Sequence, residues 1–323
     1  MGKNLGWINN VLKRIIPLLL VIFGSTLILS LLLQLLPVGL KDLYIAPGDE
    51  ASVNEQLKSL GLDGNAFTFY FHWLNDFVRG NFGYIIFPGG GREPVSNRLA
   101  TALPISLRLV FYVQIVSLLV SVPLGIYTAY RAGRRSDRVI SYSLFAAASV
   151  PNFVFGLLLA IFIGVKLGWA PSVAMINDSM SLGEKLAAIA LPVTVLTLVV
   201  LAHMMRMTRA AILNVMQSAY IETAELKGLS SFQVISRHAF PNAIAPIVNV
   251  VMLNLAYLVV GVVVVEVVFV YPGMGQYLVD HVAKRDVPVV QACGLVFAAV
   301  YILLNMVADI VSILANPRLR HPK

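Results

Sequence analysis

The feature that most constrains this chain is a series of long apolar runs separated by short polar segments. About six of these runs reach the roughly 20 residues that a helix needs to cross a bilayer. Their approximate bounds are Ile15–Leu36, Ser106–Tyr130, Val139–Val165, Leu186–Met205, Ile244–Val270 and Val289–Ala315. Because a helix satisfies its own backbone hydrogen bonds in lipid, the runs predict an all-α polytopic membrane protein with about six transmembrane helices.

The composition agrees with this class. Of the 323 residues, 58% are hydrophobic and 12% are charged, about half the charged fraction of an average soluble domain. The single cysteine, Cys293, excludes an intrachain disulfide and a thiolate metal cluster built from this chain alone. The first run follows Lys13 and Arg14 but is too long for a signal peptide, so we expect it to stay as a membrane anchor.

The basic residues gather in alternate polar segments: the N-terminal tail, the connections after the second and fourth runs, and the C-terminal tail. They are Lys3, Lys13, Arg14, Arg131, Arg134, Arg135, Arg138, Arg206, Arg209, Lys227, Arg237, Arg318, Arg320 and Lys323. The acidic residues of these segments are Asp137, Glu222 and Glu225. The positive-inside rule therefore predicts that both termini are cytoplasmic, and that the net charge of +8 reflects topology rather than a nucleic-acid partner.

The runs divide the chain into four predicted parts. Residues 1–37 form a tail and the first helix, and residues 38–104 form a small external segment. Residues 105–315 form a five-helix core that includes a cytoplasmic loop, 206–243, and residues 316–323 form a cytoplasmic tail. The external segment is rich in aromatic residues and ends near a glycine cluster, Gly89–Gly91. It is either a packed cap over a pathway or an interfacial helix at the headgroup level.

A polar stretch in the cytoplasmic loop, Tyr220–Gly228, predicts a short exposed helix that ends on a glycine. A second helix is predicted to begin at Ser230, because Ser230 and Gln233 have capping-box spacing. Small residues, Ala219, Ala224 and Gly228, would let another surface approach, and apolar residues, Ile221, Leu226, Leu229 and Phe232, would contact it. We interpret this hairpin as a docking element for another protein, the alternative being a solvated loop with helical propensity.

The motifs of common enzymes are missing from the sequence. It contains no G-x-x-x-x-G-K-[ST] phosphate loop, no H-E-x-x-H zinc helix and no G-x-S-x-G nucleophile elbow. The histidines lie on different segments without metal-ligand spacing: His72, His203, His238, His281 and His321. These observations disfavour an enzyme and a metal site in this chain.

Two carboxylates interrupt apolar runs, Glu266 in the fifth and Asp309 in the sixth. Each costs about 2.5–3.5 kcal/mol at the centre of a membrane helix, so each should face protein or water. They are candidate pathway residues that contact substrate or relay protons. The alternative is a structural carboxylate that fixes helix packing.

The hairpin also carries a family resemblance. Glu222-Thr223-Ala224, three residues, Gly228, nine residues and then His238-Ala239-Phe240-Pro241 resemble the EAA loop of ABC-importer permeases. Flanking residues resemble the first permease of the dipeptide, oligopeptide and nickel group over nearly the whole chain. These include Ala219–Leu229, Val265–Phe269, Tyr271–Gly275, Arg285–Gln291, Asn316–Arg320 and, in the external segment, Leu60–Asp63, Tyr70 with Trp73-Leu74, Gly80–Gly83 and Pro94-Val95. Thr223, His238 and Phe240 depart from the general loop pattern.

The resemblance implies a non-enzymatic permease subunit in a bacterial cytoplasmic membrane. It implies that a second, homologous permease completes the pathway, that an extracytoplasmic binding protein delivers substrate, and that two ATPase subunits bind ATP and magnesium while this chain holds no cofactor. The residues implied to dock the ATPase are Tyr220, Glu222, Thr223, Ala224, Lys227, Gly228, Leu229 and Pro241. Peptides are the group's commonest cargo, and nickel complexes or other small solutes are alternatives.

Two other classes stay open from the residues alone. An ion- or proton-coupled secondary transporter would use Glu266, Asp309 or His203 as a relay and would need no ATPase. A membrane-embedded enzyme would need polar groups that converge at one depth of the bilayer.

Overall fold

The computed structural model describes residues 20–21, 23–28, 31, 66–86, 92–177, 179–284 and 286–315. Most of the first apolar run, the Leu60–Asp63 and Gly89–Gly91 features and residues 316–323 lie outside the described residues. The chain forms two compact units. One combines Met1–Leu103 with Tyr277–Val300, and the other combines Pro104–Gln276 with Tyr301–Lys323.

The first unit contains the external segment. Helix α4 (Ala66–Val78) is followed by strands β1 (Tyr84–Ile86) and β2 (Arg92–Pro94), which pair antiparallel with Tyr84 opposite Pro94. Apart from this short ribbon, the elements of the described residues are helices, which confirms the predicted all-α fold. The sequence Tyr84-Ile85-Ile86 favours a strand, because aromatic and β-branched residues fit a pleated surface.

Aromatic rings of α4 pack along one another. The ring centroids of Tyr70 and Trp73 lie 6.0 Å apart, those of Trp73 and Phe77 5.7 Å, and those of Phe77 and Phe82 4.9 Å. The Tyr70 hydroxyl also donates to the Phe23 carbonyl at 2.9 Å, which ties α4 to the first apolar run. Tyr70 and Trp73 are buried, whereas Phe67 and Phe71 are exposed. Part of the aromatic set is therefore a packed core, and part stays available to the surroundings.

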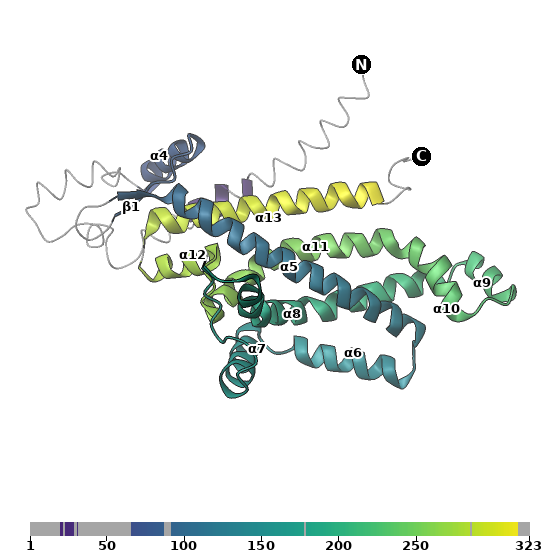
Figure 1. Cartoon of the computed structure of the whole chain (residues 1–323). Helices are drawn as coiled ribbons and strands as arrows, with labels where there is room; N and C mark the ends of the chain where they lie inside the picture. The colour runs from purple at the N-terminus through teal and green to yellow at the C-terminus, as the bar shows by residue number, and fades with distance from the viewer. Residues whose placement is uncertain are drawn as a thin grey trace, which may run out of the picture. The chain divides into compact units, whose positions relative to one another are not determined.

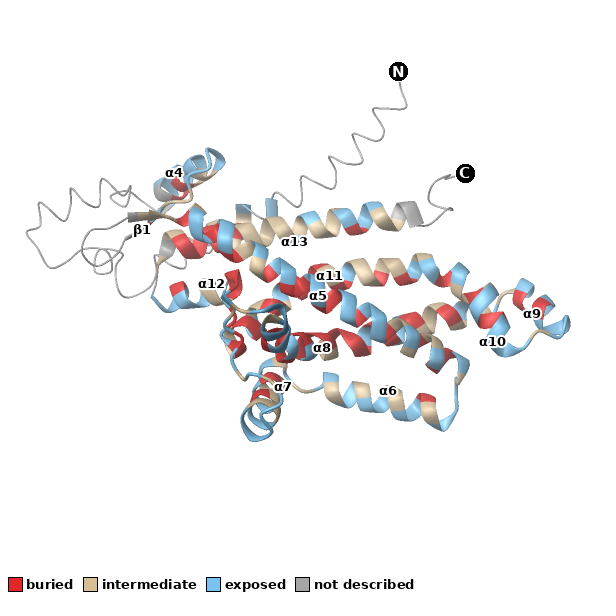
Figure 2. Cartoon of the chain, viewed as in Figure 1, coloured by how far each residue is buried: buried red, intermediate tan, exposed pale blue. Residues whose placement is uncertain are grey.

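The second unit is a bundle of long helices, in which α6 (Arg135–Ala148), α8 (Leu182–Met216) and α11 (Phe240–Phe269) lie side by side (Figure 1). Helix α5 (Val95–Tyr130) contributes its residues from Pro104 onward. Gly125 lets α5 approach α8 closely, because a Cβ there would lie 2.6 Å from the Thr208 Cβ. The buried residues line the facing sides of the helices, and exposed residues cover the outward sides (Figure 2).

Four helices of the described residues are long and apolar enough to cross a membrane: Val95–Tyr130, Leu182–Met216, Ser231–Phe269 and Pro288–Ser312. The predicted third span, Val139–Val165, is instead two helical pieces bent by 98°, α6 and then α7 (Asn152–Leu159) with the π-helix η1 (Ala160–Lys166). Pro151 stands at this break, because its ring disfavours helical geometry at the preceding residue. The described residues thus hold up to five spans, and the predicted count of six is not confirmed.

The fourth span was predicted too short. The predicted span is Leu186–Met205, whereas the observed helix α8 has 35 residues. It begins at a capping box, in which Ser181 Oγ accepts the Glu184 N–H at 3.3 Å and the Ser181 N–H donates to the Glu184 carboxylate at 2.8 Å. Its C-terminal part, with Arg206 and Arg209, extends beyond the apolar run toward the hairpin. Helices α12 (Met274–Ala283) and α13 (Val287–Ala315) are the last two helices of the described residues.

Candidate functional site

The polar hairpin predicted from sequence is present between α8 and α11. Helix α9 (Ala219–Leu226) turns at Gly228 into α10 (Ser231–Val234), which continues through the π-helix η2 (Ile235–Ala239) into α11. Gly228 has φ +81°, in the left-handed region that glycine adopts without strain. Both halves of the predicted capping box are formed, since Ser230 Oγ accepts the Gln233 N–H and the Gln233 side chain accepts the Ser230 N–H.

The hairpin has its own apolar core. This core combines residues of α5, α8, α9, α10, η2 and α11: Ala129, Ile212, Ile221, Ala224, Val234, Ile235, Ala239, Ala243 and Ile247. Ile221 is 1% exposed and Ala224 7% exposed. The interpretation that these two residues are open to a partner is therefore wrong. Their side chains pack against the bundle and hold α9 in place, because a two-helix loop of this size cannot bury a core alone.

The rest of the predicted docking set lies on the outside of the hairpin. Leu226 is 83% exposed and Tyr220 46% exposed, both large apolar or aromatic side chains. Glu222, Thr223, Lys227, Gly228 and Pro241 are also exposed, and Leu229 is half-buried. Phe232, 64% exposed, sets its ring edge against the Tyr130 ring of α5 at a centroid distance of 6.4 Å. The hairpin thus presents a mixed surface of apolar and charged side chains on a fixed base.

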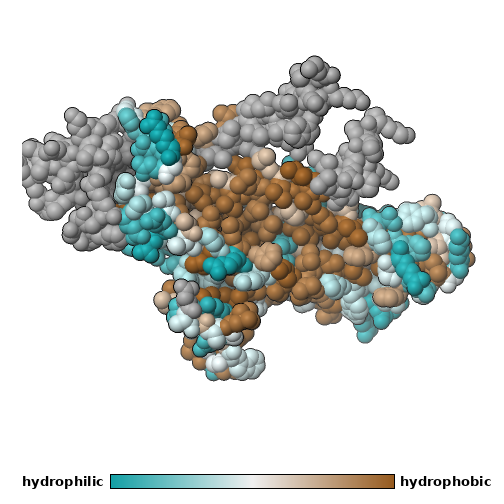
Figure 3. Space-filling model, turned by 45° about the horizontal axis from the view of Figure 1, so that its top comes forward, coloured by the Kyte–Doolittle hydropathy of each residue, from teal (hydrophilic) through white to brown (hydrophobic). Residues whose placement is uncertain are grey.

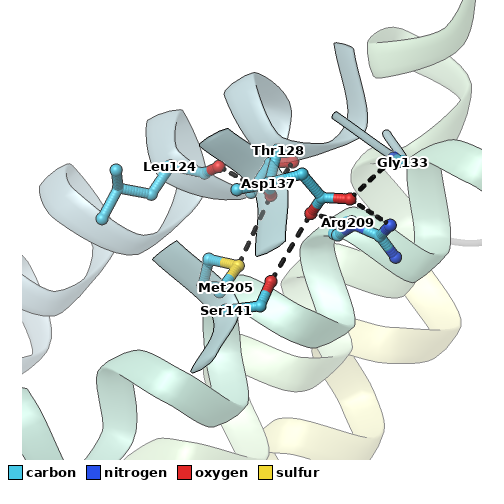
Figure 4. A network of polar contacts seen from close by, with 8 residues as sticks. Leu124, Thr128, Gly133, Asp137, Ser141, Met205 and Arg209 are labelled. Carbon is cyan, nitrogen blue, oxygen red and sulfur yellow. Dashed lines mark hydrogen bonds and ion pairs between the residues drawn. The ribbon is translucent and has the colours of Figure 1, made fainter. Parts of the chain in front are cut away.

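A polar clamp ties the base of α8 to the preceding helices (Figure 4). The Asp137 carboxylate of α6 accepts hydrogen bonds from Arg209 Nε at 3.0 Å and Arg209 Nη2 at 2.8 Å, and from the Gly133 N–H at 2.9 Å. Asp137 is buried, whereas the Arg209 side chain is 30% exposed. A two-pronged Arg–carboxylate contact fixes geometry as well as charge, so α6 and the hairpin-bearing end of α8 are held in one arrangement.

Glu266 lies at the opposite end of α11, fully buried. One carboxylate oxygen accepts the Ser106 hydroxyl at 2.5 Å, and the other accepts the Gly275 N–H at 2.6 Å and the Gln276 N–H at 3.2 Å. The carboxylate therefore caps the first turn of α12 and joins it to α5 and α11. These contacts favour the structural alternative for Glu266, while its assignment to a transport pathway stays a prediction.

The chain is shaped closely around this carboxylate. A Cβ at Gly273 would collide with both Glu266 oxygens, and a Cβ at Gly275 would lie 2.6 Å from the Val263 Cα. Tyr271 is buried beside them, and its hydroxyl donates to the Ile105 carbonyl at 3.4 Å. Burial raises the pKa of Tyr271 to about 12, so the phenol stays protonated and can donate this bond.

Asp309 differs from Glu266 in its surroundings, because it is exposed on α13. His203, the other residue of the relay hypothesis, is exposed on α8, and its Nδ1 lies 3.4 Å from Asn254 Nδ2. Within the described part of the chain, no three His, Cys, Asp or Glu side chains gather where they could hold a metal ion. The three relay candidates therefore occupy different environments, one buried and two exposed.

Sequence reasoning did not pair Asp137 with Arg209, nor Ser106 with Glu266. A signal for the first pair was present: Asp137 is the single acid among the arginines of 131–138, and such a lone carboxylate selects a cation. No local signal could find Ser106, because 160 residues separate it from Glu266.

Comparison with known proteins places the chain in a family. Residues 121–321 match the family described as binding-protein-dependent transport system inner membrane component. The oligopeptide transport system permease protein AppB of Bacillus subtilis is 30% identical over 96% of this chain and 99% of its own length. The glutathione transport system permease protein GsiC of Escherichia coli K12 is 32% identical over 97% of this chain and 99% of its own length.

A solved structure agrees at the level of the fold. A chain of the inward-facing MetNI methionine ABC transporter superposes with a TM-score of 0.56 at 17% identity, and the match covers 69% of this chain and 99% of that chain. The helical bundle, the hairpin between α8 and α11 and the family match agree with one another, and the ion-coupled alternative finds no support among these relatives. The chain belongs to the binding-protein-dependent transport system inner membrane components and is the permease component of an ABC importer.

Proposed function

We propose that this chain forms half of a translocation pathway for peptides or a related small solute across the bacterial cytoplasmic membrane. A second, homologous permease forms the other half, a binding protein delivers the solute from outside, and two ATPase subunits act on the cytoplasmic side. The names of the relatives support the cargo class, since they include an oligopeptide and a glutathione permease. Both termini and the α9–α10 hairpin are cytoplasmic in this proposal, as the distribution of basic residues indicates.

The observation that carries the proposal is the exposed face of the hairpin. A solvated loop has no reason to display Leu226 and Tyr220 beside Glu222 and Lys227, whereas a docking surface combines apolar anchors with a polar rim. The buried side of the same helix holds Ile221 in the bundle core. In this proposal the buried side of α9 attaches the helix to the bundle, and its exposed side contacts the ATPase subunit.

This attachment lets the hairpin act as a lever. The hairpin core, the Asp137–Arg209 clamp and the Tyr130–Phe232 contact join α9 and α10 to α5, α6, α8 and α11. When ATP binding draws the two ATPases together, movement of a docked hairpin is transmitted to these helices and switches the pathway between outward and inward access. ATP and its magnesium ion would be held by the partner subunits.

Docking is tested by replacing an exposed anchor without touching the hairpin core. We expect Leu226→Asp to reduce co-purification of the ATPase subunits with the tagged permease at least tenfold, because an exposed apolar anchor becomes charged. The matched control is Phe71→Asp, an exposed apolar residue of the external segment. Equal ATPase recovery with wild type and Leu226→Asp would exclude this face as the docking site.

Transport is tested in proteoliposomes that contain both permeases, both ATPases and the binding protein. We expect uptake of a labelled dipeptide or tripeptide to require internal ATP and to survive a protonophore. Uptake that ends with the proton gradient and continues without ATP would overturn the importer proposal and make Glu266 the residue to test.

A further inference from the structure

A turn rich in arginine joins α5 to α6 at the hairpin end of the bundle. This arginine turn contains Arg131, Arg134, Arg135 and Arg138. The last three are exposed and Arg131 is half-buried. The turn lies beside the hairpin, because the Tyr130 ring that precedes it contacts Phe232.

The positive charge of this turn is not compensated locally. Asp137 is the single acid of the segment, and its carboxylate is already paired with Arg209 of α8 (Figure 4). Within the part of the chain that the structure describes, none of the four arginines forms an ion pair. Arg206 adds a further exposed guanidinium, whose Cζ lies 4.9 Å from the centroid of the Phe145 ring on α6. The surface therefore carries a net positive charge that an external anion can neutralise.

The turn is held in one conformation. Gly133 has φ +76°, its N–H donates to Asp137 at 2.9 Å, and the Arg134 N–H donates to the Arg131 carbonyl at 2.9 Å. Arg131 lies over the Tyr130 ring at 5.3 Å from its centroid, and its Nε is buried with no hydrogen-bond partner among the described residues. A buried N–H without an acceptor costs free energy, so an anion bound beside Arg131 would stabilise the site by accepting this hydrogen bond.

The side chains around the turn place it at the headgroup level of a bilayer. Tyr127 is 42% exposed on α5, and Val139 and Tyr142 are 66% and 69% exposed on α6. Exposed tyrosines beside exposed aliphatic residues are typical of the membrane interface. The hydrophobic surface of the helices gives way to a hydrophilic surface toward the end that carries α9 and α10 (Figure 3).

We infer that the arginine turn binds the phosphate of an anionic phospholipid in the leaflet on the hairpin side. Guanidinium groups bind phosphate through two parallel hydrogen bonds, and arginine clusters next to a membrane helix attract anionic lipid. A lipid fits this surface better than a soluble protein, because the apolar neighbours Val139 and Tyr142 need hydrocarbon contact beside the anion. The arginine turn joins α5 to α6 and is not part of the α9–α10 hairpin. The inference therefore depends neither on ATPase docking nor on the identity of the cargo.

The test uses the full chain in phosphatidylcholine bilayers with spin-labelled phosphatidylglycerol or spin-labelled phosphatidylcholine as the probe. We expect wild type to associate preferentially with phosphatidylglycerol at low salt, and high salt to reduce this preference by screening. Neutralising the three exposed arginines (R134Q, R135Q and R138Q together) should lower the preference at least about fivefold, since the loss of even one basic residue at the surface, worth about 1 kcal/mol, has that effect.

The matched control neutralises three exposed cations elsewhere, Arg79, Arg108 and Lys284, each to Gln, and should leave the preference unchanged. Replacing the same three arginines of the turn by lysine keeps the charge and the topology, and should retain part of the preference because lysine binds phosphate as a point charge. Equal lipid preference in wild type and the Gln variant would overturn the inference. The inference would also be overturned if, in pure phosphatidylcholine, the arginine turn became shielded from solvent only when the ATPase subunits bind. That result would identify the turn as a protein interface.

Discussion

Two single residues, Gly228 and Glu266, have roles that follow from backbone conformation and from hydrogen bonds. Gly228 is needed for its positive φ rather than for space, because no atom lies within 4 Å of where a Cβ would stand. Glu266 is needed for its acceptors, because three donors from two other segments converge on its two oxygens. Backbone conformation explains the need for Gly228, and hydrogen bonding explains the need for Glu266. Each explanation gives a prediction.

Replacing Gly228 with alanine should destabilise the chain by about 1–2 kcal/mol, the cost of a left-handed conformation for an L-residue. Gly183→Ala is the matched control, since Gly183 also has open space at its Cβ but lies in the first turn of α8 with ordinary helical φ. Thermal unfolding in detergent should show a loss only for the first variant. A neutral Gly228→Ala would mean that the turn relaxes to another conformation.

Replacing Glu266 with alanine should lower the free energy of unfolding by about 3 kcal/mol, because two buried N–H groups and the Ser106 hydroxyl lose their acceptor. Glu266→Gln should cost less, since its amide oxygen can still accept. Asp309→Ala, at an exposed position, should cost under about 1 kcal/mol. If Glu266→Ala kept full stability and lost only uptake, the carboxylate would act in the pathway and the structural interpretation would fail.

At the scale of elements, the clamp between α6 and α8 links parts that the hairpin would move together. Asp137 comes from the first turn of α6, and Arg209 comes from the stretch of α8 beyond the predicted apolar run. The extension of α8 therefore has a physical use, since it carries the cation that a buried carboxylate requires.

A double-mutant cycle measures this link. Arg209→Gln should destabilise the chain by about 3–5 kcal/mol, because it leaves the buried Asp137 carboxylate uncompensated, and Asp137→Asn should cost less, because the Arg209 side chain is 30% exposed. The double variant should cost less than the sum of the two single variants, with a coupling energy of about 1.5–3 kcal/mol. Chemical unfolding in detergent gives the four free energies. Additive losses would show that the contact does not hold α6 to α8.

At the scale of the whole molecule, the family match and the basic residues together predict one orientation in the membrane. Cys293 is fully buried, so it provides an unreactive background for cysteine labelling. The exposed positions Leu226 in the hairpin and Phe71 in the external segment are then reporters for the two sides.

A membrane-impermeant maleimide should label Leu226→Cys in inside-out vesicles only, and Phe71→Cys in right-side-out vesicles only. Ile221→Cys, on the buried side of the same hairpin, should stay unlabelled until the protein is denatured. Labelling of both exposed reporters from one side would contradict the proposed topology, whatever the importer's cargo.

The membrane class could be predicted from the amino-acid sequence, as could most of the long helices, the glycine turn at Gly228 and the capping box at Ser230. These features depend on local chemistry: run length against bilayer thickness, backbone freedom, and a side chain that reaches a backbone group three residues away. The α9–α10 hairpin could be predicted for the same reason, since its two helices and its turn are local, while its docking role stays a proposal.

Tertiary contacts, in contrast, set which face of each helix is buried and where a helix bends. In the folded chain Ile221 and Ala224 face the core, and the third predicted span bends at Pro151. Ser106 contacts Glu266, and Arg209 contacts Asp137. Hydropathy measures how apolar a run is, but not which neighbour covers each face or where a helix bends. Those outcomes depend on contacts between residues far apart in the chain, where packing and buried charge, rather than local preference, set the lowest free energy.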